Sequence, residues 1–115
     1  MVTNQDIEAR LESLFSQAAE ALNGTKYYYN NSSHGQYWTL EWYAPLGHMR
    51  VWLRPRKETA RLVVLDVSAR IKTAGESPTL GSIPLTDEAG NPQINPDGIF
   101  DLILQCEPKL LEKKL

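Results

Sequence analysis

The sequence predicts an α+β domain in which an antiparallel meander of three to five strands is packed on one face by an N-terminal and a C-terminal helix. Three observations support this prediction. Apolar residues recur at helical spacing in both terminal segments. Between these segments, residues 37–71 alternate apolar and polar side chains with a period of two. The turns that interrupt this alternation are short enough for direct hairpins, whereas parallel pairing would need longer crossovers.

The first segment predicts a helix over residues 4–23. Its apolar residues repeat every three or four positions and therefore share one face: Ile7, Leu11, Leu14, Phe15, Ala18, Ala21 and Leu22. Thr3 or Asn4 can cap the first amides, and Asp6 falls in the positive first turn. Gly24 is the expected stop, since glycine adopts the left-handed conformation without a Cβ clash.

The central segment predicts the strands of the meander, in residues 37–44, 49–54 and 62–71, with turns at 45–48 and 57–59. The apolar members that would face the helices are Trp38, Leu40, Trp42, Met49, Val51, Leu53, Val63, Leu65, Val67, Ala69 and Ile71. The tyrosines of residues 25–36 favour a further short strand that leads into a hairpin. Residues 81–86 fit an edge strand, because Pro84 cannot donate to a central ladder.

The last segment opens on Asn95, Pro96 and Asp97, which together form a strong helix start signal. The expected apolar face comprises Ile99, Leu102, Ile103 and Cys106, widened by Phe100, Leu104 and Leu111. Pro108 lacks an amide donor and should end or kink this helix near Glu107.

Length and composition limit the function classes. With 115 residues, the chain is expected to form a single domain over 1–115. Its one cysteine excludes an internal disulfide and a multi-cysteine zinc site. The first residues lack the basic and apolar regions of a signal peptide, and no run of 18 apolar residues exists, so a cytoplasmic protein is expected.

The residues with reactive side chains predict no catalytic site, metal site or cofactor. His34 and His48 fall in predicted turns, without the clustered spacing of metal ligands. Cys106 is expected to pack in the core as a small apolar residue. Glu41 and Asp66 could form a carboxylate pair, but the arginines nearby should keep both ionised. Glycine-rich phosphate loops are absent from the sequence.

Charge is unevenly distributed along the chain. Residues 25–72 hold eight basic and three acidic residues, while residues 73–107 hold six acidic residues and no basic one. The predicted sheet is therefore basic although the whole chain has a net charge of -2. Within it, the arginines and Trp52 of one strand and the tyrosines of its neighbour should share the face that the helices leave open. The candidate contact residues are Tyr37, Tyr43, Arg50, Trp52, Arg54 and Arg56.

Several functions remain open for this face. Guanidinium groups bind carboxylates or phosphates through forked hydrogen bonds, and aromatic rings supply stacking area. Tyr, Trp and Arg are also the usual hot-spot residues of protein interfaces. We therefore predict a non-catalytic protein-binding module of the adaptor, chaperone or inhibitor type, with single-stranded nucleic acid as the alternative ligand. In a purely structural explanation, the arginines stack on the rings and neutralise Glu41 and Asp66.

Two further alternatives involve other parts of the chain. The segment 73–98 could act as the lid of a small ligand-binding domain or enzyme, which would need a deep pocket with convergent polar groups. An edge strand or the aromatic face could also pair with a second copy of the chain across a two-fold axis.

Overall fold

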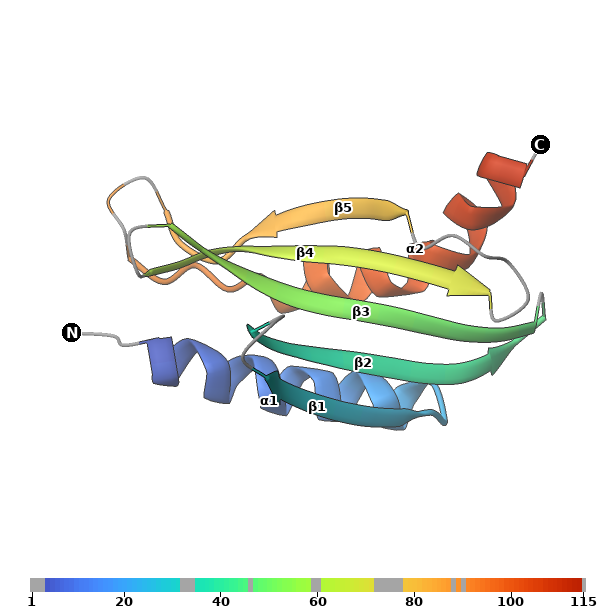
Figure 1. Cartoon of the computed structure of the whole chain (residues 1–115), viewed down its shortest axis with the longest axis horizontal. Coiled ribbons are helices and arrows are strands. Elements are labelled where there is room, and N and C mark those ends of the chain that lie inside the picture. The colour runs from blue at the N-terminus through green and yellow to red at the C-terminus, as the bar shows by residue number, and fades with distance from the viewer. Residues whose placement is uncertain are drawn as a thin grey trace.

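The structure is a computed structural model that describes residues 4–31, 35–45, 47–58, 61–71, 78–87, 89 and 91–114. The elements in chain order are α1 (Asn4–Ala21), β1 (Thr25–Asn31), β2 (Gly35–Ala44), β3 (Gly47–Glu58), β4 (Arg61–Ile71), β5 (Thr79–Pro84) and α2 (Pro96–Lys114). The strands form one sheet in the order β1-β2-β3-β4-β5, and every neighbouring pair is antiparallel. Both helices lie behind this sheet in the view of Figure 1. The predicted α+β meander with terminal helices on one face is confirmed.

The core lies between the sheet and the two helices. Helix α1 covers β1 and β2, while α2 covers β4 and β5. The strands contribute Trp38, Leu40, Trp42, Met49, Val51, Leu53, Leu62, Leu65, Val67, Ala69 and Ile71, all less than 9 % exposed. These residues alternate with residues that are more exposed along most of each strand. The period of two in the sequence therefore separates a covered face from an open one.

Helix α1 buries its apolar face as predicted, with Ala19 buried and Ala21 exposed at its end. The left-handed residue after the helix is Asn23, with φ +53°, and not Gly24 as predicted. Gly24 is required for a different reason. A Cβ there would collide with the backbone oxygen of Glu41 and approach Trp42 Cβ to 3.0 Å, because Gly24 lies directly against β2 just before β1 begins.

A bulge changes one part of the predicted core. Arg56 is paired with Val64 and Lys57 with Leu62, so Val63 has no partner across the strands. As a result Leu62 is buried and Val63 is only half-buried. The prediction of Val63 in the core was wrong at this position, because the extra residue shifts the alternation by one.

Helix α2 begins as predicted, with the Asn95 side chain accepting a hydrogen bond of 3.1 Å from the Gly98 amide. Pro108 does not end the helix, which continues to Lys114. Figure 1 shows that the last turns of α2 bend away from the sheet, as the kink expected of an internal proline. Leu104 is 55 % exposed and does not widen the buried face as predicted. The side chain of Leu111 lies outside the described residues.

The segment before α2 is partly ordered by backbone hydrogen bonds. The predicted edge strand is β5, and the turn after it is closed by hydrogen bonds of 2.8 Å between Asp87 and Asn91. Residues 72–77, part of the proposed lid, lie outside the described ranges. Neither α1 nor α2 combines the length and the apolarity that a bilayer-spanning helix needs.

Candidate binding face

We call the sheet surface opposite the helices the open face. Its side chains belong to Tyr27, Tyr29, Tyr37, Thr39, Glu41, Tyr43, His48, Arg50, Trp52, Arg54, Arg56, Asp66, Ser68 and Arg70. The strand register arranges them in rows that cross the sheet. One row runs from Tyr27 through Thr39 and Trp52 to Ser68, and the next from Glu41 through Arg50 to Arg70.

The aromatic rings form a packed layer on this face. Tyr29 and Tyr37 stack with their ring centroids 4.9 Å apart and an interplanar angle of 19°. Thr39 lies between Tyr27 and Trp52 in its row and is only 3 % exposed. Trp52 itself is half-buried, whereas the two tryptophans of the covered face are buried. Contacts with neighbouring side chains therefore restrict the aromatic rings of the open face.

Arginines lie over these rings. The guanidinium carbons of Arg50 and Arg70 lie 5.7 and 5.3 Å from the centre of Trp52. That of Arg54 lies 5.0 Å from the centre of the Tyr37 ring. These distances fall within the range of cation–π attraction, which is worth about 0.5–1 kcal/mol at exposed sites. The rings thus hold three guanidinium groups in place above the sheet.

The arginines differ in whether they have an acidic partner. Arg50 donates to Glu41 through Nε at 2.6 Å, and Arg56 contacts Asp66 at 3.2 Å. Among the described residues, Arg54 and Arg70 form no ion pair. The Nε atom of Arg70 is also buried, with no hydrogen-bond partner within the described ranges. Two of the four arginines on the open face therefore form no ion pair in the described part of the chain, although Asp66 lies opposite Arg54 across β3 and β4.

Five of the six predicted contact residues lie close together. Arg50, Trp52, Arg54 and Arg56 share one side of β3, and Tyr37 joins them through its contact with Arg54. Tyr43 shares the face but lies at the far end of β2, 87 % exposed, with its ring 5.0 Å from that of His48. In the described part of the chain its ring contacts His48, whereas the rings of Trp52 and Tyr37 contact arginines.

Arg70 was missed at the sequence level, although its position in the alternation of β4 already assigned it to this face. Its importance depends on Trp52, which lies on the neighbouring strand and contacts it only after β3 and β4 pair. The stacking of Tyr29 on Tyr37 could not be predicted for the same reason, because a hairpin whose register the sequence does not specify brings the two residues together.

The carboxylates and the thiol considered for chemistry lie in different parts of the fold, Glu41 on β2, Asp66 on β4 and Cys106 on α2. Glu41 lies opposite Arg50 and Asp66 opposite Arg54, four positions further along β3. At roughly 3.4 Å per residue, this separates the two carboxylates by about 14 Å along the strand. Burial raises the pKa of the Cys106 thiol to about 12, which keeps it protonated and unreactive.

The histidines also fail to form a cluster in the described part of the chain. His48 belongs to β3 and is paired with Tyr43, so its prediction as a turn residue was wrong, and His34 lies outside the described residues. Within the described ranges, no three His, Cys, Asp or Glu residues come together as a metal site would require.

A hollow of about 360 Å³ opens on the face beside Trp52. Its walls are formed by Trp52, Arg54, Asp66, Ser68 and Thr79. It therefore presents an aromatic ring, a guanidinium group, a carboxylate and hydroxyl groups. Comparisons with protein-family models, curated protein sequences and solved structures found no match to this chain.

Proposed function

We propose that the protein is a non-catalytic protein-binding module, of the adaptor, chaperone or inhibitor type, and that its open face binds an acidic segment of the partner. The observation that carries this proposal is the pair Arg54 and Arg70. Both are held against aromatic rings, and neither has a carboxylate partner among the described residues. A carboxylate from a partner would complete them through charge-assisted hydrogen bonds.

The aromatic layer supports the same function. Tyr, Trp and Arg dominate the energetics of protein interfaces because they bury large areas with few freely rotating bonds. On the open face, stacking already restricts Tyr29, Tyr37 and Arg54, so less conformational entropy is lost when a partner binds. The hollow beside Trp52 offers a place for one partner side chain.

Single-stranded nucleic acid is less well supported by the charges. Arg50 and Arg56 are paired with Glu41 and Asp66, which leaves two uncompensated arginines to contact phosphates. With about 0.7 released counterions per phosphate on a single strand, log K would then fall with log salt at a slope of only about -1.4. This slope is shallow for a protein whose affinity would depend on the phosphate backbone.

The test uses Trp52 as the reporter, since the other two tryptophans are buried. Acrylamide quenching of tryptophan emission is measured while an array of Asp- and Glu-rich peptides, and separately oligo-dT, is titrated into the protein. We expect a subset of acidic peptides to protect Trp52 from quenching. The variant Arg54→Glu should weaken this binding at least tenfold, because it replaces an attraction by a repulsion.

The matched control is Arg10→Glu, which makes the same charge change at an exposed position of α1. It should bind the same peptides as the wild type. Equal loss in both variants, or no protection of Trp52 by any peptide, contradicts the proposal. Strong protection by oligo-dT alone would instead support nucleic-acid binding by the same face.

A further inference from the structure

The two edges of the sheet differ in how well they are protected against pairing with another strand. Edge strand β5 contains Gly81 and ends at Pro84, and its pairing with β4 shifts register between Val67 and Ser68. Edge strand β1 is paired with β2 over seven consecutive residues without a shift, and it contains no proline or glycine. Irregular, proline-containing edges resist strand addition, whereas long regular edges invite it. Strand β1 is therefore the open edge of this sheet.

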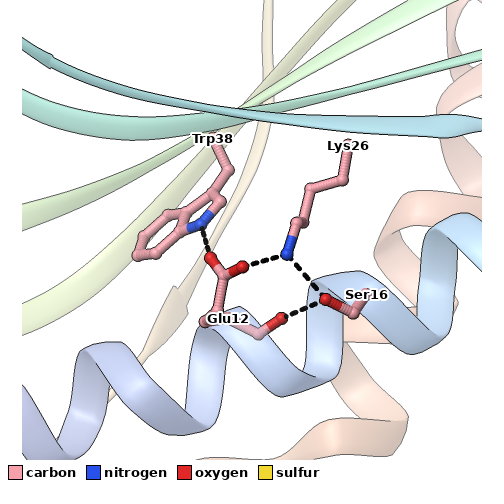
Figure 2. A network of polar contacts seen from close by, with 4 residues as sticks. All are labelled: Glu12, Ser16, Lys26 and Trp38. Atoms are coloured by element: carbon pink, nitrogen blue, oxygen red, sulfur yellow. Dashed lines mark hydrogen bonds and ion pairs between the residues drawn. The ribbon is translucent and has the colours of Figure 1, made fainter.

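Charged side chains are the other common protection of an edge strand, and lysine is the usual one. The only charged residue of β1 is Lys26. Its ammonium group is turned under the sheet, where it donates to the Glu12 carboxylate and, at 2.6 Å, to the hydroxyl of Ser16 (Figure 2). The side chain of Lys26 is only 19 % exposed. Because Lys26 is bound and neutralised by α1, its charge does not protect β1 against pairing with another strand.

The sequence of β1 is also suited to pairing with itself. The antiparallel register that uses all seven residues of both copies places Tyr28 opposite Tyr28 of the second copy. On the open face, this register places Tyr27 of each copy opposite Tyr29 of the other. The stacked pair Tyr29 and Tyr37, with centroids 4.9 Å apart, shows that a cross-strand tyrosine pair packs well on this surface. Such aromatic pairs add about 0.2–1 kcal/mol each to strand pairing.

We propose that β1 is a dimerisation strand, which pairs antiparallel with β1 of a second copy of this chain about a two-fold axis at Tyr28 and extends the meander into a ten-stranded sheet. The inference goes beyond the proposed function, because it assigns the edge of the sheet and leaves the arginine cluster of β3 and β4 free. Each tyrosine of β1 is 40–47 % exposed in the single chain, and the dimer would cover a large part of that surface.

The test measures the dimer dissociation constant by sedimentation velocity over a concentration series. In Tyr28→Glu, the two new carboxylates face each other across the axis, and α1 holds Glu8 and Glu12 near the same position. Like charges directly opposite disfavour strand pairing, so we expect a dissociation constant at least about tenfold higher than that of the wild type. The matched control is Tyr43→Glu, the same replacement at an exposed site of β2, which should leave the dimer intact.

A second pair of variants tests the part played by Lys26. Glu12→Gln removes the charge that holds Lys26 under the sheet, and it should weaken the dimer. Glu20→Gln makes the same change at an exposed position of α1 and should not. Circular dichroism and a thermal melt show that each variant is folded at the temperature of the measurement. A wild-type protein that stays monomeric at its highest soluble concentration overturns the proposal. Loss of the dimer in Tyr43→Glu but not in Tyr28→Glu would assign the contact to the open face and overturn it as well.

Discussion

The polar network under β1 and β2 supplies a stability test that can be worked out from the structure. Glu12 on α1 accepts hydrogen bonds from Lys26 of β1 and from the indole of Trp38 of β2 (Figure 2). The perturbation is Glu12→Gln, which keeps the shape of the side chain and removes its charge. The amide has a single acceptor oxygen, so Lys26 and the Trp38 indole can no longer each donate to a separate oxygen, and the bond that remains lacks the carboxylate charge. Helix α1 should therefore be held less firmly against the sheet.

The expected loss of stability depends on how exposed the Glu12 side chain is. A hydrogen bond to a charged group is worth about 1.5–3 kcal/mol when it is well shielded from water. The Glu12 side chain is 46 % exposed, and exposed ion pairs contribute only about 0–1 kcal/mol. We therefore expect Glu12→Gln to lower the free energy of unfolding by about 1 kcal/mol at neutral pH. For a domain of this size the change corresponds to about 4 °C in Tm.

The pH dependence provides the sharper criterion. The Lys26 hydrogen bond, with a smaller contribution from Trp38, holds the pKa of Glu12 below its ordinary value of 4.5. A carboxyl whose pKa is lower in the folded state stabilises that state at pH values above its unfolded pKa. This contribution is lost as the pH falls through the lowered pKa. The difference between wild type and Glu12→Gln should thus be full at pH 7 and shrink below pH 4.5.

The assay is urea unfolding of both proteins followed by tryptophan fluorescence between pH 7 and pH 3, with Glu20→Gln as the control. The control should stay within about 0.5 kcal/mol of the wild type, since Glu20 is an exposed residue of α1. If Glu12→Gln is as stable as the wild type at pH 7, or if the difference is unchanged at pH 3, the network does not stabilise the fold in this way.

Two further predictions concern backbone fit and thiol chemistry. Gly24→Ala should lower the free energy of unfolding in urea by about 1–3 kcal/mol, because the added Cβ would collide with the backbone of β2. Asn23→Gly should change it little, since glycine adopts the left-handed conformation of that position. Equal losses in both variants would contradict this explanation. The Cys106 thiol, with its pKa raised to about 12 by burial, should resist a disulfide reagent at pH 8 in the native protein and react at once in urea. Fast modification of the folded protein would show that this part of α2 opens.

Local periodicity explains which parts of the fold could be predicted. The three- and four-residue spacing of α1 and the alternation in β2 and β3 are properties of short segments, and both determine which side chains are buried. The same alternation placed Arg50, Trp52 and Arg54 on one face before their contacts were known. Positions that depend on one extra residue, such as Leu62 and Val63 at the bulge, could not be predicted, since a bulge has no clear signal in a single sequence.

Contacts between distant segments could not be predicted from the sequence for a different reason. Lys26 and Trp38 lie 14 and 26 residues from Glu12, and their meeting requires both the docking of α1 and the register of β1 on β2. The stacking of Arg70 on Trp52 likewise depends on the register of β4. Each of these pairs is determined by the assembled sheet. The composition of the open face could therefore be predicted from the sequence, but not which arginine pairs with Glu41 and which with Asp66.

The charge pairing is what separates a binding face from a structural one. If the arginines served only to stabilise the sheet, they would stack on the rings and neutralise Glu41 and Asp66. Arg50 and Arg56 do so, through Glu41 and Asp66. Arg54 and Arg70 stack on aromatic rings without an ion pair, and the buried Nε of Arg70 has no acceptor among the described residues. A buried donor without a partner costs about 1–3 kcal/mol. Replacement of Arg70 by leucine should therefore be tolerated by the fold and should weaken binding to acidic peptides, whereas a purely structural arginine would show the reverse.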